Sequence, residues 1–405
     1  MTKKVLLTSI LTVFLLAMTF AQERGVVKGN KKYAEYSFSP AIVIYKKVID
    51  KGYVTNELLE KLGNSYYFNA NYEEAEKVYK QLIETYGSEV GPEYYFRYGQ
   101  TLKTLGDYTN SDSILARFAD MTSNDLRSQI IKTSKDYKEE IARNSGRYDI
   151  ELFEYNSKYS DFAPAFYKEG LIFSSDRDTG NLAKYRHTWN SKDFLDIYKV
   201  NADSSSSNRV VKMNMINSRL HESSSVATRD GTTIYFTRNN FIDGKTRKDE
   251  EGIVSLKIFR INWKDGEWSD LEELPFNSDN YSVAHPALSP DEKTLFFAAD
   301  MPDSKGGSDI YKVSINNDGK FGPPINLGAP INTESRETFP FVSSENILYF
   351  SSDGHPGLGG LDIFATKIDY EDYSNPVLNV GEPVNSSRDD FSYIINEENK
   401  RGYFA

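Results

Sequence analysis

A strand-rich unit recurs along the second half of the chain, and this repetition constrains the fold more than any other feature. Its clearest copy runs from Ala284 to Val313. That copy holds a first strand, the turn Ser289-Pro290-Asp291-Glu292, the apolar run Leu295-Phe296-Phe297, a Gly-rich loop and a last strand around Ile310-Tyr311. Pro and Asp favour chain reversal, and the apolar runs favour strands. Three antiparallel strands cannot bury both of their faces, so each unit requires neighbours of the same kind.

Two features recur in a fixed order with this unit. The apolar run ending in Phe returns at 53- to 63-residue intervals, in copies that end at Phe173, Phe236, Phe297, Phe350 and Phe404. An Asn-Ser or Asn-Thr pair opens every unit, at Asn156, Asn217, Asn277, Asn332 and Asn385. Self-similarity at this period in units made only of strands predicts the blades of a β-propeller.

Composition narrows the class of protein. The 405 residues predict two or more domains, and a 39% hydrophobic fraction is sufficient for folded cores. The net charge of −11 argues against a nucleic-acid partner, because phosphate binding requires a basic face. The absence of cysteine excludes disulfides, Cys-based zinc sites and thiol catalysis.

The first 21 residues have the pattern of a signal peptide. Lys3-Lys4 precedes the apolar run Val5 to Phe20, and Thr19-Phe20-Ala21 fits a small-x-small cleavage site. A membrane anchor is the alternative, but the run is short for a membrane span. We therefore expect an exported chain that begins at Gln22.

Residues 22–146 have the composition of a helical domain. Leu62-Gly63-Asn64-Ser65-Tyr66, followed by Ala75 and Tyr79, resembles the tetratricopeptide repeat, and a second copy around Gly99 and Leu115 follows 36 residues later. In this pattern Gly lets two helices approach, while aromatic residues fill the space between them. An unrelated helical bundle is the alternative.

Two further helical elements are expected in this domain. A half-copy of the repeat covers Ser39 to Val48, with Ser39 as N-cap and Pro40 at the first helical position. A last helix at about Asn124 to Ala142 would cover the open end of the stack.

Residues 147–405 form the predicted propeller. Tyr148 to Phe153 reads as an isolated strand that would complete the last blade, and the insertions 178–192 and 239–252 should be exposed loops. The sequence stops at Tyr403-Phe404-Ala405, inside the repeated apolar strand. We therefore expect a propeller truncated in its fifth blade, within a longer native protein.

The repeated Ser-Pro-Asp-Glu-Lys-Thr-Leu-Phe-Phe segment and its following Gly-Gly-Ser-Asp-Ile-Tyr resemble the WD40-like Pro-Asp propeller repeat, also found in the TolB family. An export signal, tetratricopeptide repeats and such a propeller, in this order, resemble the OmpA-family periplasmic scaffolds of Bacteroidetes, which include a type IX secretion component. The resemblance implies protein partners in the cell envelope, among them an outer-membrane β-barrel. It also implies peptidoglycan binding through a C-terminal domain missing here.

An acid follows the Asn of the opening pair by five residues in four of the units. These acids are Asp161, Glu222, Glu337 and Asp390, with Ser282 at the corresponding place in the remaining unit. One interpretation is a ring of like charge at a channel mouth that binds a basic peptide or a cation. The other is that each acid accepts hydrogen bonds from local backbone groups. The Asn-Ser pairs themselves are expected to form turns.

The concave face of the helical repeats is the other candidate binding surface. If the usual stacking holds, this face carries Asn64, Tyr67, Tyr95 and Arg97, which would hold an extended peptide or a partner helix. The alternative is that Tyr67 and Tyr95 are packed between helices.

No motif predicts catalysis, a metal or a cofactor. The four histidines are scattered (His187, His221, His285 and His355), no Gly-x-Ser-x-Gly segment occurs, and the Asp spacing near the Gly-Gly loops does not match a calcium loop. The sequence therefore predicts a non-enzymatic scaffold that is exported to the periplasm and associated with the outer membrane. The alternative is a sensor or carrier that binds a small ligand or glycan in the propeller channel.

Overall fold

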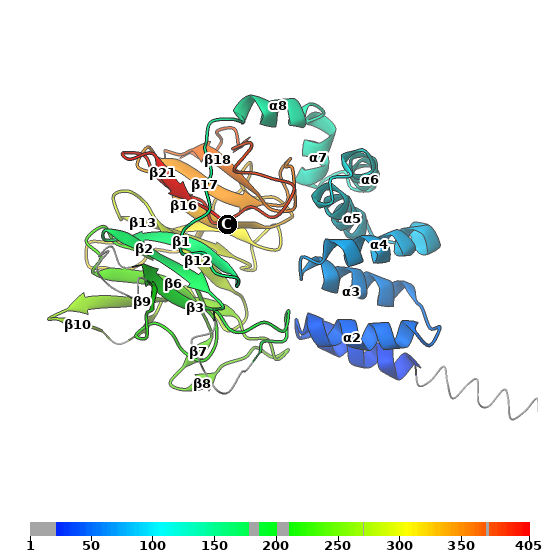
Figure 1. Ribbon diagram of the computed structural model, residues 1–405, viewed down its shortest axis with the longest axis horizontal. Helices are drawn as coiled ribbons and strands as arrows, with labels where there is room; N and C mark the ends of the chain where they lie inside the picture. The colour runs from blue at the N-terminus through cyan, green and yellow to red at the C-terminus, as the bar shows by residue number, and fades with distance from the viewer. Residues whose placement is uncertain (1–21, 178–185, 201–209, 270, 370–371) are drawn as a thin grey trace, which may run out of the picture. The chain divides into compact units, whose positions relative to one another are not determined.

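The computed structural model describes residues 22–177, 186–200, 210–269, 271–369 and 372–405. The predicted signal peptide lies outside the described residues. The chain divides into two compact units, one formed by residues up to Phe118 with Arg186–Lys192, and the other by Ala119–Tyr185 with Asp193–Ala405 (Figure 1). Among the described helices, none combines the length and the apolar character that a membrane crossing requires.

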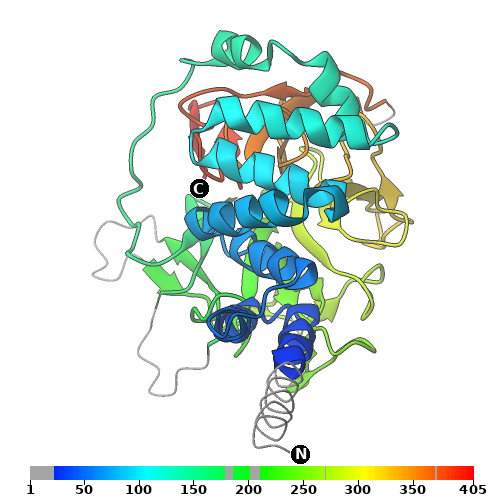
Figure 2. The same cartoon turned by 90° about the vertical axis from the view of Figure 1, so that its right-hand side faces the viewer.

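The first unit is a stack of three helical hairpins (Figure 2). The hairpins pair a helix over residues 22–34 with α2 (Phe38–Ile49), α3 (Asn56–Tyr67) with α4 (Tyr72–Tyr86), and α5 (Pro92–Thr104) with α6 (Tyr108–Met121); the 3-10 turn η1 (Gly87–Glu89) follows α4. The predicted half-copy is thus a complete hairpin. The predicted N-cap was also wrong, because α2 begins at Phe38, with Ser37 before it.

A small residue facing a large one brings the two helices of each hairpin together. A Cβ atom at Gly63 would lie 2.6 Å from Tyr79 Cε1, and one at Gly99 would lie 2.6 Å from the Leu115 side chain. Gly29 meets the ring of Tyr45 in the same way. These contacts confirm the packing expected from the repeat pattern, and Gly29 extends it to the first hairpin.

The helical segment after α6 belongs to the second unit. It consists of two short helices, α7 (Leu126–Thr133) and α8 (Tyr137–Asn144), rather than the single helix expected over 124–142. The backbone N–H of Leu126, at the start of α7, donates to Glu334 Oε2 over 2.9 Å. The side-chain Nδ2 of Asn144, at the end of α8, donates to the carbonyl of Asn379 over 3.1 Å. A propeller carboxylate thus caps the start of α7, and the side chain of the last residue of α8 is bonded to a propeller carbonyl.

The second unit contains four complete antiparallel sheets and a two-stranded fifth. The first sheet has β1 (Asp161–Tyr167), β2 (Gly170–Ser175), β3 (Asp196–Val200) and β4 (Val210–Lys212); the second has β5 (Glu222–Ala227), β6 (Thr233–Asn239), β9 (Leu256–Lys264), β10 (Glu267–Trp268) and β11 (Glu272–Glu273). The third has β12 (Val283–Leu288), β13 (Thr294–Ala299), β14 (Asp309–Ser314) and β15 (Ile325–Asn326); the fourth has β16 (Glu337–Val342), β17 (Ile347–Ser352), β18 (Asp362–Lys367) and β19 (Leu378–Asn379); the fifth has β20 (Ile394–Asn396) and β21 (Arg401–Tyr403).

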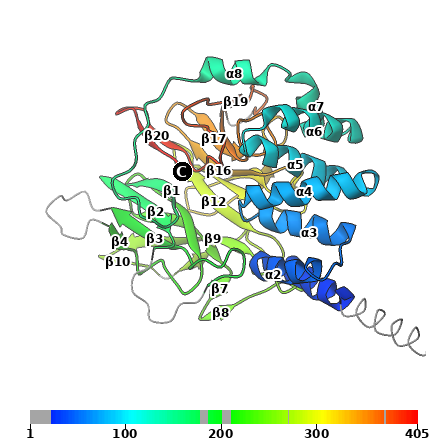
Figure 3. The same cartoon turned by 45° about the vertical axis from the view of Figure 1, so that its right-hand side comes forward.

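The sheets are blades around a common centre. The first strands of neighbouring blades lie side by side, β1 with β5, β5 with β12 and β12 with β16, and the later strands step outward (Figure 3). The N–H of Ala163 in β1 donates to Ser392 Oγ just before β20, which brings the fifth sheet beside the first. Separate apolar cores lie between successive blades, such as the one that joins Ile258 to Phe297. The sheets of the second unit thus form a propeller-like arrangement, as predicted, and not one continuous sandwich.

Two expectations about individual segments were wrong. Residues 148–153 form no strand, and they contact the fifth sheet through rings, with Tyr148 against Tyr393 and Phe153 against Tyr403. The insertion over 239–252 carries a hairpin of β7 (Phe241–Ile242) and β8 (Lys245–Thr246), whose Phe241 is buried. Of the insertion over 178–192, the described part, Arg186–Lys192, is a mostly exposed turn, as expected, and it belongs to the helical unit.

Candidate functional site

The helical unit holds Arg186–Lys192 as a turn, which His187 closes by donating from its N–H to the carbonyl of Lys192 and by accepting from Ser191 N, each at 3.1 Å. The N–H of Ser39 contacts the carbonyls of Thr188 and Trp189 at 3.2 and 3.1 Å, and the hydroxyls of Ser37 and Thr188 are 2.9 Å apart. Trp189 is the anchor, since its indole Nε1–H donates to the carbonyl of Phe68 over 3.0 Å. Backbone hydrogen bonds together with one aromatic anchor are features by which proteins hold peptide segments.

Three aromatic rings lie beside the indole of Trp189, a residue that stays 40% exposed. Phe38 lies edge-on with ring centroids 4.7 Å apart, and Tyr36 and Phe68 lie at 6.0 and 6.4 Å. Phe38 comes from the start of α2, and Phe68 directly follows α3, so the sequential stacking of two hairpins creates this site. We call Tyr36, Phe38 and Phe68 the aromatic clamp.

The four predicted groove residues have defined places in the helical unit. Asn64 is buried, donates to Tyr33 Oη over 2.9 Å and accepts from Tyr79 Oη over 2.8 Å. Tyr67 and Tyr95 are also buried, as the packing interpretation expected. Arg97 is partly exposed, pairs with Glu93 at 3.2 Å and places its guanidinium 5.0 Å from the ring centre of Phe68. A role for these residues in partner binding stays a prediction.

The repeated acids of the propeller accept hydrogen bonds from their own opening pairs. Asp161 accepts from Ser157 N at 2.5 Å, Glu222 from Ser218 N at 2.8 Å, Glu337 from Thr333 N at 2.8 Å, and Asp390 from Ser386 N at 2.6 Å. In each case the Ser or Thr hydroxyl donates to the same carboxylate. This geometry matches the structural interpretation of the acids, and their binding to a partner stays a prediction.

The third blade has no acid at this position because it carries one more residue before its first strand. Val283, not Ser282, begins β12 and pairs with Ala299, as Glu337 pairs with Ser352. An apolar side chain therefore replaces the carboxylate inside this blade.

Burial raises the pKa of three of the acids. The pKa of Glu337 rises to about 8, and those of Glu222 and Asp390 to about 7, because desolvation outweighs their hydrogen bonds and, for Glu222, the ion pair with Arg238 at 2.8 Å. Burial also raises the pKa of Asp161, but this effect is outweighed by hydrogen bonds from Arg177, 2.6 Å away, and from Ser175. The pKa of Asp161 is therefore lowered. The series thus mixes one ionised acid with three that burial pushes toward the neutral form.

The Asn of each later opening pair joins two blades. Asn332 accepts from Ile310 N at 2.8 Å and donates to Ile310 O at 3.0 Å, and equivalent pairs join Asn217 to Ile197, Asn277 to Ile258 and Asn385 to Ile363. The side chain thus supplies an acceptor for an N–H on the third strand of the preceding blade, while the carbonyl of the same residue also accepts from a backbone N–H, such as that of Leu327 for Ile310. Asn156, which opens the first unit, is exposed and has no such bond within the described residues.

The Asp that begins the third strand in most blades also closes a turn. Asp309 accepts from Lys305 N and Asn326 Nδ2, and Asp362 accepts from Leu358 N and Gly359 N. Lys257 occupies this position in the second blade and pairs with Glu273 and Asp279, each at 2.6 Å.

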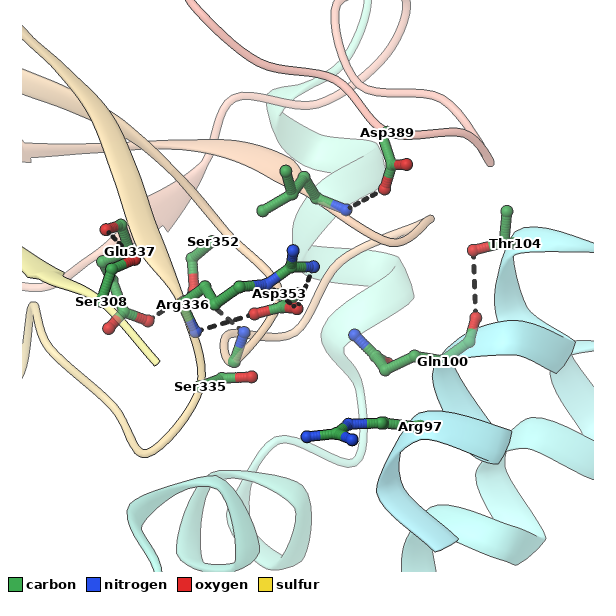
Figure 4. Close-up of polar contacts among 12 residues, drawn as sticks. Arg97, Gln100, Thr104, Ser308, Ser335, Arg336, Glu337, Ser352, Asp353 and Asp389 are labelled. Carbon is green, nitrogen blue, oxygen red and sulfur yellow. Dashed lines mark hydrogen bonds and ion pairs between the residues drawn. The ribbon is translucent and has the colours of Figure 1, made fainter. Parts of the chain in front are cut away.

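Other polar side chains near the blade junctions are also engaged in contacts. Arg336 pairs with buried Asp353 at 2.7 Å, and Ser352 Oγ donates to Glu337 Oε1 over 2.7 Å (Figure 4). Within the described residues, no group of three or more His, Cys, Asp or Glu side chains has a metal-binding arrangement.

A cavity of about 260 Å³ lies among the first strands of the blades. It is lined by β1, β5, β12 and β16 and by the segment that enters β20. The strands bulge at equivalent points, where Ala163, His285, Phe339 and Ser392 have φ of 52, 58, 49 and 57°. None of the four repeated acids lines this cavity.

His285 lines the cavity and belongs to a chain of polar groups. Its Nδ1 lies 2.7 Å from Ser224 Oγ, which is 2.9 Å from Thr237 Oγ1, and its backbone N–H donates to Thr237 Oγ1 over 2.8 Å. Its ring centroid is 3.8 Å from that of Phe339. Burial lowers the pKa of His285 to about 3, so the imidazole is neutral.

Sequence reasoning missed Trp189, Ser224 and His285 as functional candidates. A signal existed for His285, since Ala163-Pro164, His285-Pro286 and Phe339-Pro340 occupy the same position in three units. No signal marked Trp189, because its partners are more than 100 residues away in the sequence.

A comparison with protein families identifies the repeats of the helical unit. A family model described as tetratricopeptide repeat matches residues 57–87 and 92–125. The chain has no match among curated proteins.

Similar solved structures include a Mycobacterium tuberculosis puromycin-hydrolyzing peptidase, which is 11% identical with a TM-score of 0.34 over 58% of this chain and 32% of the peptidase. This chain therefore spans about a third of the peptidase. An α-L-arabinofuranosidase from Lactobacillus brevis is 14% identical with a TM-score of 0.39, over 60% of this chain and 82% of that enzyme. At these values the similarities carry no argument about activity. The chain thus contains tetratricopeptide repeats followed by a propeller-like domain, two architectures that favour a protein-interaction scaffold.

Proposed function

We propose that the protein is a non-catalytic scaffold that binds protein partners through its helical repeats and its propeller. The observation that carries this proposal is the turn Arg186–Lys192 on the helical unit. Two backbone acceptors and the indole of Trp189 in this turn contact the repeats at once. A helical unit that holds one peptide turn in this way has the chemistry to hold another.

The cellular setting is part of the same proposal. A basic, then apolar N-terminal segment with a small-x-small site supports export to the periplasm. The resemblance to OmpA-family scaffolds supports association with the outer membrane, within a cell-envelope or type IX secretion and gliding complex. An outer-membrane β-barrel is the partner that this resemblance favours, and peptidoglycan would be reached through a domain outside this sequence.

A peptide added in trans tests the binding mode. The full chain with Trp189→Ala empties the aromatic clamp, and a labelled peptide with the sequence of residues 186–192 should then bind, as measured by fluorescence anisotropy. A peptide with Ala in place of Trp189 should bind at least about tenfold more weakly, because aromatic anchors dominate such interfaces. Equal binding of the two peptides would refute the clamp as a recognition site.

A pull-down from envelope extracts tests the setting. The immobilised full chain should enrich envelope proteins, with an outer-membrane protein among them, over an unrelated acidic control protein. Recovery of soluble metabolic enzymes alone would contradict the envelope proposal.

The absence of catalysis is also a proposal with a direct test. A screen against peptidase and glycosidase substrates should give no turnover. Turnover that disappears on Ser224→Ala would overturn it, because Ser224 and His285 form a hydroxyl–imidazole pair beside a cavity.

A second candidate function is the binding of a small ligand or glycan in the propeller channel. The cavity among the first strands favours this candidate. A ligand that binds there should raise the melting temperature of the full chain, with a stabilisation that grows as the logarithm of one plus the ratio of ligand concentration to Kd.

A further inference from the structure

The cavity in the propeller has one closed end made of rings. Phe339 and His285 line it, and Phe162 and Phe391 lie directly behind, at 6.4 and 5.2 Å from Phe339 between ring centroids. Neither Phe162 nor Phe391 lines the cavity. The aromatic rings therefore form a floor across the channel, and the cavity lies on one side of it.

The walls above this floor are mainly apolar. Equivalent bulges contribute Pro164, Pro286 and Pro340, and the strands beyond them contribute Phe166 and Leu288. Such walls bind flat apolar groups and offer little to a molecule that carries many hydroxyl groups.

Most polar side chains in the lining already have partners. Ser289 donates to Asp291, Ser392 accepts from Ala163 N, and Ser344 contacts Glu397. At the exposed end Arg229 donates to the carbonyl of Pro290, and Glu292 accepts from Arg229 N. A sugar would have to bury several hydroxyl groups without partners, at about 1–3 kcal/mol each.

The hydrogen-bond chain at the floor fixes the tautomer of His285. Thr237 is buried, and its hydroxyl oxygen accepts from His285 N, so its hydrogen must go to Ser224 Oγ, the acceptor available among the described residues. Ser224 then donates to Nδ1 of His285. The imidazole is neutral and carries its proton on Nε2, which has no hydrogen-bond partner among the described residues.

We propose that this cavity binds a small, flat, largely apolar molecule whose oxygen acceptor receives a hydrogen bond from Nε2–H of His285. A ketone, an amide or a similar carbonyl fits this description better than a glycan. The cavity holds about nine non-hydrogen atoms, at the roughly 30 Å³ that one water takes in the liquid. The inference rests on the second candidate function and is independent of the peptide site on the helical unit.

Two isosteric probes test the proposal on the full chain. Acetophenone carries a carbonyl oxygen where α-methylstyrene carries a methylene group, and the two have the same shape. Saturation-transfer NMR and titration at up to about 1 mM should show acetophenone binding roughly tenfold more tightly, because α-methylstyrene leaves the N–H unpaired.

Two variants locate the donor. His285→Phe should bring acetophenone down to the affinity of α-methylstyrene. The fold should tolerate this change, because Phe339 has nearly the same positive φ at the equivalent position of the fourth blade. Ser225→Ala removes a neighbouring lining hydroxyl, keeps the imidazole and should leave the preference for acetophenone unchanged.

Each contrary result overturns the proposal. If neither probe binds the wild-type chain, the cavity does not take this class of molecule. If both probes bind equally, or if Ser225→Ala removes the preference while His285→Phe keeps it, Nε2–H is not the recognition group. The peptide experiment on the aromatic clamp is unaffected by any of these outcomes, so failure here is distinguishable from failure of the scaffold proposal.

Discussion

The two units both repeat a short motif, but the motifs solve different physical problems. In the helical unit the recurring contact is steric, a glycine against a large side chain, as in Gly63 and Tyr79. In the propeller the recurring contacts are polar and buried, as in Asn332 and Glu337. The sequence must therefore specify side-chain size at the helix contacts of the first unit, and buried polar side chains in the propeller.

The reason lies in where the backbone hydrogen bonds go. An α-helix satisfies its interior N–H and C=O groups by itself, so its repeats need only shapes that let helices approach. At the blade junctions, N–H groups of the third strands, such as that of Ile310, have no ladder partner, whereas their carbonyls accept from backbone N–H groups. Side chains such as Asn332 must supply these partners, and they must do so inside the protein.

The largest effect should come from removing a blade-joining amide. Asn332→Ala removes the partner of the buried N–H of Ile310, whose carbonyl keeps its bond from Leu327 N, and we expect it to destabilise the propeller by about 2 kcal/mol. Asn156→Ala is the matched control, because this exposed residue has no equivalent bond within the described residues, and it should cost less than about 0.5 kcal/mol. Urea unfolding of the full chain measures both. Equal costs would break the comparison between polar and steric repeats.

A steric substitution should come next. Gly63→Ala improves helix propensity by about 1 kcal/mol but places a Cβ atom 2.6 Å from Tyr79 Cε1. We expect overpacking to dominate and the helical unit to lose about 1–2 kcal/mol, seen as a lower melting temperature by circular dichroism. Lys80→Ala, at an exposed helical position, is the control and should change little. A stabilised Gly63→Ala chain would show that the close approach is not required.

A pH effect should separate the propeller acids from one another. The raised pKa of Glu337 means that its contribution to stability is present below its unfolded pKa and is lost as pH rises through about 8. Glu337→Gln should therefore remove roughly 1–2 kcal/mol of the stability difference between pH 5 and pH 8. Denaturant titrations at several pH values measure this difference.

The contribution of Asp161 to stability should change with pH in the opposite direction. Its lowered pKa gives a contribution that is present above the unfolded pKa and is lost as pH falls. Asp161→Asn should therefore flatten the acid side of the stability curve and leave the range from pH 5 to pH 8 unchanged. The same slope in both variants would contradict the assigned environments.

The smallest effect should come from Trp189, the anchor of the turn Arg186–Lys192. Trp189→Phe keeps a ring in the aromatic clamp but removes the N–H that donates to Phe68 O, and we expect a loss of about 0.5–1 kcal/mol in holding the segment. Hydrogen exchange at Ser39 N, which faces Thr188 and Trp189, reports this loss. Unchanged protection would show that the ring alone is sufficient.

Local spacing predicted much of the fold. The Gly63-to-Tyr79 spacing predicted a helical hairpin, and the repeated apolar runs predicted the blades. The first hairpin was seen only in half, although Gly29-Asn30 and Tyr33 repeat the spacing of Gly63-Asn64 and Tyr67. The residue before Gly29 is a lysine where the later copy has Leu62, so the pattern was weaker there.

The sequence by itself determined which elements form, because periodicity and turn residues act within a few positions. Only the tertiary structure decided what the candidate residues contact. It placed Glu337 against its own opening pair, put Trp189 on helices more than 100 residues earlier, and brought His285 beside Ser224 of another blade. The physical reason is that burial and partner choice depend on closing a ring and stacking hairpins, and no local spacing encodes those distances.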